Sequence, residues 1–371
     1  MMNIEPLLQI MIDQNGSDLF LSVGRAPSIK VNGEIFSVGK QDLTPALTRA
    51  LALKTMEEWQ RDQFLSEKEL NYALISESGE RFRANAYFHM GSVGMVVRRI
   101  RSDIPTPESL FLPPVLSDLV MAKRGIMIYT GATGVGKSTS LAALIGHRNR
   151  EASGHIVTVE DPIEFVHQHE RCIVTQREVG IDTDSWQSAL KNVLRQAPDV
   201  ILIGEIRDQE AMESALAMAE TGHLVLATLH TNNANQALDR IIHFFPVERR
   251  EQVLLDLSLN LQAIVAQQLV PTAAGQRRAV FEVLINTPFV ADLIAKGEVR
   301  QLKDAMAKSG EAGMQTFDQA LFELYSAGEI SYDNAMAFAE SKNDLRLAIK
   351  LKDDPTVSDA STEAFVIDLA D

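Results

Sequence analysis

Gly131-Ala132-Thr133-Gly134-Val135-Gly136-Lys137-Ser138 is a full match to the phosphate-binding pattern G-x-x-x-x-G-K-[ST]. The apolar run at 125–130 that precedes it is typical of a strand, and residues 137–147 have helical composition. Glycines let the backbone turn several N–H groups inward, and the following helix adds the positive end of its dipole. The order of strand, glycine loop and helix therefore predicts a nucleotide triphosphate site in an α/β domain.

The residues of this loop have separate expected roles. Lys137 would reach the β- and γ-phosphates, and the Ser138 hydroxyl would hold Mg²⁺. The expected cofactors are therefore ATP and Mg²⁺. Nucleotide contacts are expected from the loop and the first helical turn, at Gly131, Thr133, Gly134, Val135, Gly136, Lys137, Ser138 and Thr139.

Composition limits the class of protein. The chain has 371 residues, of which 46% are apolar, and this is enough for two domains with separate cores. Its formal charge of −15 counts against a partner with a phosphate backbone. The single cysteine excludes an intrachain disulfide and, with no signal peptide at the start, favours the cytoplasm. The uncharged stretch 257–276 contains Asn260, Pro271 and several glutamines, so it is not expected to span a membrane.

The pattern along the chain predicts four parts. Residues 1–100 read as a small α+β domain, in which Asn32-Gly33 predicts a hairpin turn. Residues 101–111 are rich in proline and read as a linker. Residues 112–350 alternate apolar runs with helices, as a parallel sheet requires, with one long helix expected at 247–269 and shorter helices at the end. Residues 351–371 are acidic and are expected to form a disordered tail.

Two strand-like runs end in acidic residues. Residues 159–164 read Val-Glu-Asp-Pro-Ile-Glu, and residues 204–208 read Gly-Glu-Ile-Arg-Asp. Open α/β sheets bind ligands at the carboxyl ends of their strands, so Glu164 and Glu205 are candidates to act on a γ-phosphate or its metal. The second segment resembles a Walker B strand with Gly204 at the usual aspartate position. Glu205 is therefore expected to hold Mg²⁺ weakly or through water.

A histidine and two arginines complete this set of candidates. His230 follows the apolar run 224–229 and is expected to sense the γ-phosphate by hydrogen bonding, with a structural role as the alternative. Arg195 and Arg207 flank the run at 200–203, so both are expected at the level of the nucleotide. An arginine supplied across a subunit interface would couple hydrolysis to assembly.

Together these segments resemble the secretion ATPase superfamily of type II and type IV secretion and pilus systems, and within it the pilus retraction branch of PilT and PilU. The resemblance runs from residue 9 to residue 350 and rests on the segments 131–139, 160–165, 176–180, 204–208, 220–225 and 228–231. It implies a hexameric ring in which a PAS-like N-terminal domain is joined to a RecA-like ATPase domain. It also implies that Glu164 is the general base, that Glu205 and His230 are the Walker B and histidine-box residues, and that Arg83, Arg195 and Arg207 reach a nucleotide.

Two departures from related families refine the branch. Assembly ATPases of this superfamily usually carry a zinc-binding tetracysteine motif, which a chain with one cysteine cannot build. Retraction is therefore the expected role. PilT proteins carry Ala-Ile-Arg-Asn-Leu-Ile, whereas residues 289–294 read Phe-Val-Ala-Asp-Leu-Ile and share only the last two positions. This difference indicates the PilU branch, the accessory paralogue.

The sequence thus predicts a hexameric, ATP-hydrolysing motor of pilus retraction and twitching motility, in the cytoplasm at the inner-membrane base of the pilus machine. Its expected partners are further copies of itself, a PilT-like paralogue and an inner-membrane platform protein, with neither nucleic acid nor direct membrane insertion. Two alternatives stay open, which are an ATP-binding adaptor with little hydrolysis of its own and a nucleic-acid translocase on a RecA-like core.

Overall fold

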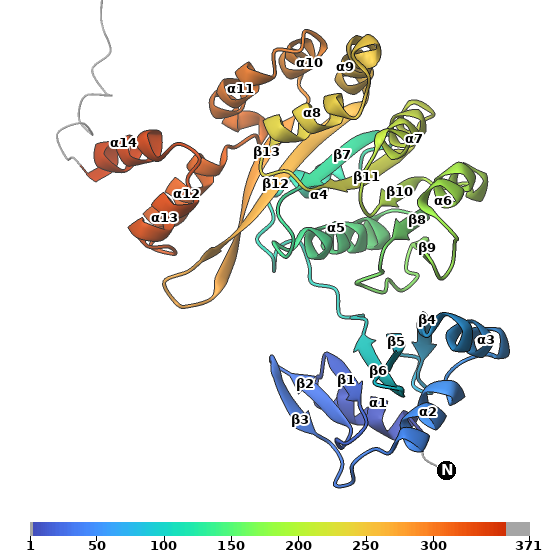
Figure 1. Ribbon diagram of the computed structural model, residues 1–371. Helices are drawn as coiled ribbons and strands as arrows, with labels where there is room; N and C mark the ends of the chain where they lie inside the picture. Colours follow the sequence, from blue (N-terminus) through green and yellow to red (C-terminus); the bar gives the residue numbers. More distant parts are fainter. Residues whose placement is uncertain (1–2, 354–371) are drawn as a thin grey trace, which may run out of the picture. The chain divides into compact units, whose positions relative to one another are not determined.

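The computed structural model describes residues 3–353, and the chain divides into two compact units (Figure 1). The first unit takes in the residues up to Ile104, together with Glu160–Gln168 and Gln176–Ala189. The second unit holds Pro105–Val159, His169–Thr175 and the chain from Leu190 onward. Two later stretches of the chain thus belong to the same compact unit as the N-terminal part.

The first unit is built on a six-stranded antiparallel sheet with the order β3-β2-β1-β6-β5-β4. Along β5, fully buried residues alternate with partly buried ones, as a sheet with one covered face requires; the fully buried residues are Phe82, Ala84 and Ala86. The elements are α1 (Glu5–Asp13), β1 (Asp18–Leu21), β2 (Ser28–Val31), β3 (Glu34–Ser37), α2 (Pro45–Lys54), α3 (Glu58–Glu67), β4 (Glu69–Ile75), β5 (Arg81–His89) and β6 (Ser92–Arg99).

The hairpin between β2 and β3 is confirmed. Asn32 and Gly33 join the two strands with φ angles of 50° and 89°. A two-residue turn of this kind needs positive φ at both positions, and these two residue types adopt it at the lowest cost.

The second unit is built on a seven-stranded sheet with the order β13-β12-β7-β11-β10-β8-β9. The five strands from β12 to β8 run parallel, so the expected parallel α/β sheet is confirmed. Every residue of β7, β10 and β11 is buried, as in sheets covered on both faces. The elements are α4 (Val115–Leu119), β7 (Gly125–Thr130), α5 (Lys137–Glu151), β8 (Gly154–Glu160), β9 (Cys172–Glu178), α6 (Trp186–Val193), β10 (Val200–Ile203), α7 (Gln209–Glu220), β11 (Leu224–Leu229), α8 (Ala234–His243), α9 (Arg250–Asn260), β12 (Leu261–Pro271) and β13 (Arg277–Ile285).

The single helix predicted at 247–269 is wrong. α9 ends at Asn260, and β12 begins at the next residue. β12 contains the β-branched residues Ile264 and Val265 and pairs with β7 on one side and β13 on the other. A strand buried between two other strands is apolar along its length, which explains the apolar run of β12. The periodicity of apolar residues does not distinguish such a strand from a buried helix.

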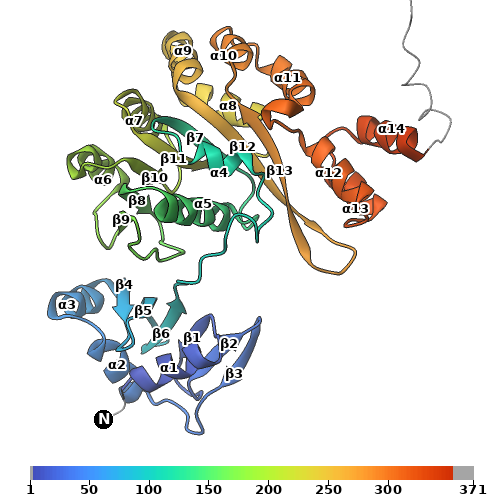
Figure 2. The same ribbon diagram turned by 180° about the vertical axis from the view of Figure 1, so that it is seen from behind.

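Five helices follow β13 within the described residues, namely α10 (Pro288–Ala295), α11 (Leu302–Lys308), α12 (Phe317–Ser326), α13 (Tyr332–Phe338) and α14 (Lys342–Asp353). Seen from both sides, α12, α13 and α14 form one group beside β13 (Figure 2). Their core joins Phe317, Leu321 and Leu345 to Val270 and Val280 of the β12–β13 hairpin.

The predicted disordered tail begins too early. α14 runs to Asp353, so residues 351–353 are helical. The remainder of that predicted tail, 354–371, lies outside the described residues. From residue 3 to residue 353, the structure contains no helix that is long and apolar enough to cross a bilayer.

Candidate nucleotide site

The glycine loop (residues 131–136) leaves the carboxyl end of β7 and leads into α5. Gly134 and Gly136 have φ angles of 82° and 91°, in the left-handed region that favours glycine. A Cβ at Gly131 would lie 2.5 Å from the carbonyl oxygen of Gln267. The loop can therefore adopt this path only with glycine at its first position.

Lys137 is folded back into the loop that it follows. Lys137 is 7% exposed, and its Nζ donates to the carbonyl oxygens of Gly131 (2.7 Å) and Ala132 (3.1 Å). Gly136, at the N-cap of α5, supplies no side-chain cap to the first turn. A buried ammonium beside uncapped N–H groups fits the phosphates of a nucleotide. All eight predicted nucleotide contacts lie on this loop and the first turn of α5.

Gln267 of β12 fixes the glycine loop from the neighbouring strand. Its side chain is 2% exposed, Nε2 donates to the carbonyl oxygen of Val135 (2.7 Å), and Oε1 accepts from Ser140 Oγ (2.9 Å). Gln267 was not predicted as a site residue, because its segment was predicted to be helical. A polar residue inside the apolar run of β12 was the signal that could have found it.

Three predicted site residues come together at the carboxyl ends of β10 and β11. His230 Nε2 lies 3.2 Å from Glu205 Oε1, and Arg207 Nε donates to Glu205 Oε2 at 2.8 Å. We call Glu205, Arg207 and His230 the Glu205 cluster. The side chain of Glu205 is 23% exposed and that of His230 is 44% exposed, so solvent or a ligand can reach both.

The end of β11 is tied to the strand that delivers the glycine loop. Thr231, the residue after His230, donates its N–H to Thr130 Oγ1 (3.0 Å), and the two hydroxyl oxygens lie 2.6 Å apart. Thr130 is the last residue of β7. These bonds hold the residue after His230 against the end of the strand that leads into the glycine loop.

The other predicted site residues lie elsewhere. Glu164 is exposed on the segment that joins β8 to β9, and this segment belongs to the first unit. Arg195 lies in the turn after α6, where it donates to Lys191 O and Asn192 Oδ1. Arg83 of β5 also belongs to the first unit, and its Nε lies 3.7 Å from Glu178 Oε1.

Glu178 is a second buried polar residue that was not predicted as a site residue. It is 4% exposed, and its Oε2 accepts the N–H of Ile163 (3.2 Å), the residue before Glu164. Burial raises the pKa of Glu178, while the Ile163 N–H and the Arg83 guanidinium lower it. Glu178 thus contacts both the Glu164 segment and Arg83.

Metal binding has a limited set of protein ligands. Across 3–353 no group of three or more His, Cys, Asp and Glu side chains could hold a metal ion by itself. Mg²⁺ in nucleotide sites is bound largely through phosphate and water, and Ser138 and Glu205 are the protein ligands that the sequence predicts for it.

Comparison with known proteins decides the family. Residues 113–347 match the family model described as "Type II/IV secretion system protein". The type IV pilus ATPase PilU of Pseudomonas aeruginosa is 60% identical over 94% of this chain and 92% of its own length. The chain belongs to the PilT and PilU retraction ATPases.

A second relative and two solved structures agree with this family. PilT of Pseudomonas aeruginosa is 40% identical over 90% of this chain and 97% of its own length. A crystal structure of the pilus retraction motor PilT with bound ADP superposes with a TM-score of 0.86 at 38% identity, covering 94% of this chain and all of that one. The ATPase DotB of Legionella pneumophila follows, with a TM-score of 0.78 at 26% identity over 90% of this chain and 94% of that one. The predicted fold class, an α+β N-terminal domain joined to an α/β P-loop ATPase domain, is confirmed.

Proposed function

We propose that the chain hydrolyses Mg²⁺-bound ATP as a subunit of a hexameric ring, and that this ring assists a PilT-like motor in retracting type IV pili. The Glu205 cluster carries the proposal, because it sets a carboxylate between a histidine and an arginine at the ends of β10 and β11, and β11 pairs with β7, the strand that leads into the glycine loop. The 60% identity to a PilU protein supports the accessory branch.

Each site residue has a part in the proposed reaction. The glycine loop, Lys137 and Thr139 bind the phosphates, and Ser138 with Glu205 would hold Mg²⁺, which offsets charge on the phosphate oxygens. Glu164 takes the proton of the attacking water. His230 donates to the γ-phosphate and reports its presence to Glu205, which it contacts.

The arginines stabilise the charge that develops on the γ-phosphate. Arg207 and Arg195 are exposed in the second unit, and such side chains can meet a nucleotide bound by an adjacent copy of the chain. To reach a phosphate, Arg83 would have to give up its contact with Glu178, and Arg207 its contact with Glu205. A ring in which one subunit completes the site of the next would couple hydrolysis to assembly.

The proposed setting is the inner-membrane base of the pilus machine. The partners are identical chains, a PilT-like paralogue and a platform protein in the membrane, and the ATPase itself remains on the cytoplasmic side. The formal charge of −15 argues against nucleic acid as the load.

A Lys137→Ala strain tests the accessory role. Loss of the buried ammonium should weaken ATP binding, so the variant should give no assistance to retraction. In a strain without the PilT-like motor, the wild-type chain should restore neither twitching zones nor sensitivity to pilus-specific phage. Lys123→Ala, at an exposed lysine before β7, is the matched control and should behave as wild type. Twitching driven by the wild-type chain alone would show an independent motor.

A further inference from the structure

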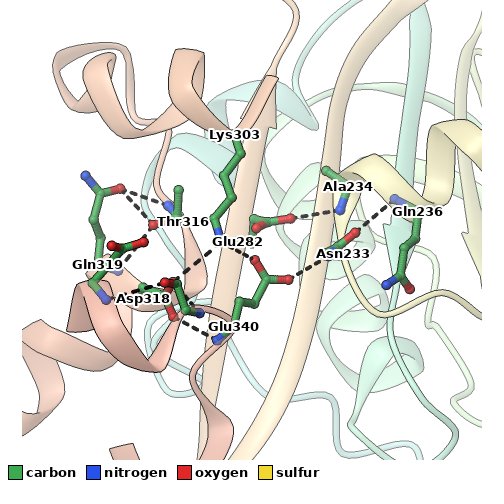
Figure 3. A network of polar contacts seen from close by, with 11 residues as sticks. Asn233, Ala234, Gln236, Glu282, Lys303, Thr316, Asp318, Gln319 and Glu340 are labelled. Carbon is green, nitrogen blue, oxygen red and sulfur yellow. Dashed lines mark hydrogen bonds and ion pairs between the residues drawn. The ribbon is translucent and has the colours of Figure 1, made fainter. Parts of the chain in front are cut away.

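The start of α8 is held by side chains from distant parts of the second unit (Figure 3). Asn233 caps α8 by accepting the N–H of Gln236 at 2.9 Å, while its Nδ2 donates to Glu340 Oε1 at 2.6 Å. Glu282 of β13, 1% exposed, accepts the N–H of Ala234 at 2.8 Å. Both carboxylates therefore act on the first turn of α8.

Glu340 is itself fixed by the C-terminal helices. It lies in the link between α13 and α14, and its Oε2 accepts from Lys303 of α11 at 3.0 Å. Asp318, in the first turn of α12, accepts the backbone N–H of Glu340 at 2.9 Å and lies 3.5 Å from Lys303. The position of Glu340 thus follows the positions of α11, α12 and the α13–α14 link.

Asn233 lies three positions after His230 in the chain. The connecting segment has two anchors, since Thr231 bonds to Thr130 beside the glycine loop and Asn233 bonds to Glu340. A displacement of Glu340 would therefore move Asn233, at one end of the segment 230–233. His230, at the other end of this segment, contacts Glu205.

We infer that the Asn233–Glu340 hydrogen bond is a positioning contact, which couples the C-terminal helices α12–α14 to His230 and so to the Glu205 cluster. The inference rests on the proposed ATP site. It adds a route by which a partner that moves the C-terminal helices would change turnover without touching nucleotide.

Reversing the hydrogen bond tests this inference. Asn233→Asp keeps an oxygen for the Gln236 N–H, and aspartate caps helices as well as asparagine does, but it sets a carboxylate against Glu340. Adding Glu340→Gln supplies an amide that donates to the new carboxylate. We expect kcat to fall by roughly tenfold in Asn233→Asp and to recover in the double variant, with the Kd for ATP unchanged in both. Thr287→Asp, at the N-cap of α10, is the matched control for a new charge at a helix start.

Hydrogen exchange in the nucleotide-free protein gives a readout that does not depend on turnover. Amides of residues 231–236 should exchange faster in Asn233→Asp and return to the wild-type rate in the double variant. If the wild-type chain hydrolyses no ATP, the proposed function fails and this exchange result alone decides the inference.

Two outcomes would overturn the coupling. One is a single variant with wild-type kcat and exchange, and the other is a double variant no better than the single one. If Asn233→Asp does not fold, Asn233→Ser keeps the cap without repulsion and should show the same loss of kcat. Wild-type kcat in that variant would equally contradict the inference.

Discussion

Glu282 shows how burial changes the chemistry of one residue. Desolvation is the main cause that raises its pKa from 4.5 to about 7, with Glu340 and Asp318 adding to the shift. The Ala234 N–H and Lys303 oppose it. The Glu282 carboxyl therefore binds its proton more tightly in the folded protein than in the unfolded chain. The stability that this proton contributes is full below pH 4.5 and is lost as the pH rises towards about 7.

Glu282→Gln should remove this pH dependence. Glutamine still accepts the Ala234 N–H but does not titrate. Between pH 5 and pH 8, the free energy of unfolding of the wild type should therefore fall by about 1–3 kcal/mol more than that of the variant. Denaturant unfolding at the two pH values measures the difference. Glu248→Gln, at an exposed glutamate, should leave the pH dependence as it is. A wild type and a Glu282→Gln variant that respond equally to pH would refute the assignment.

Among the secondary-structure elements, β12 was predicted as part of a helix, and it is also the element that supports the glycine loop. The apolar run of β12 matches a buried helix as well as a buried strand, and only pairing with β7 and β13 decides between them. Because the segment was predicted as a helix, the role of Gln267 in holding the glycine loop was not predicted. The loop itself was predictable, because its glycines, Lys137 and Ser138 are adjacent in the chain.

Gln267→Leu should weaken nucleotide binding. It removes two hydrogen bonds, to Val135 and from Ser140, so the Kd for ATP should rise about tenfold. Titration of the purified protein with a fluorescent ATP analogue measures this. Gln268→Leu, one residue further along β12 and half-buried, is the control and should keep the wild-type affinity. Equal affinity in the Gln267→Leu variant would show that β12 does not support the loop.

Across the whole molecule, sequence patterns located site residues that lie in or beside short motifs. They missed contacts between residues that are far apart in the chain. The strand ends that carry Glu205 and His230 were predictable, because parallel strands align their carboxyl ends. The Asn233–Glu340 bond joins residues 107 apart, and no pattern along the chain signals it. The contact of Glu178 with Arg83 was missed for the same reason, since the two lie in separate segments of the first unit.

The proposed function requires that this chain turns over ATP with Glu164 as its general base. Phosphate release by purified wild-type and Glu164→Ala protein, with Mg²⁺ and saturating ATP, measures this most directly, and Glu170→Ala serves as the exposed control on the same β8–β9 connection. We predict that Glu164→Ala lowers turnover by about 100-fold or more and leaves the Kd for ATP within about twofold of wild type. Turnover that is unchanged in Glu164→Ala would contradict the account.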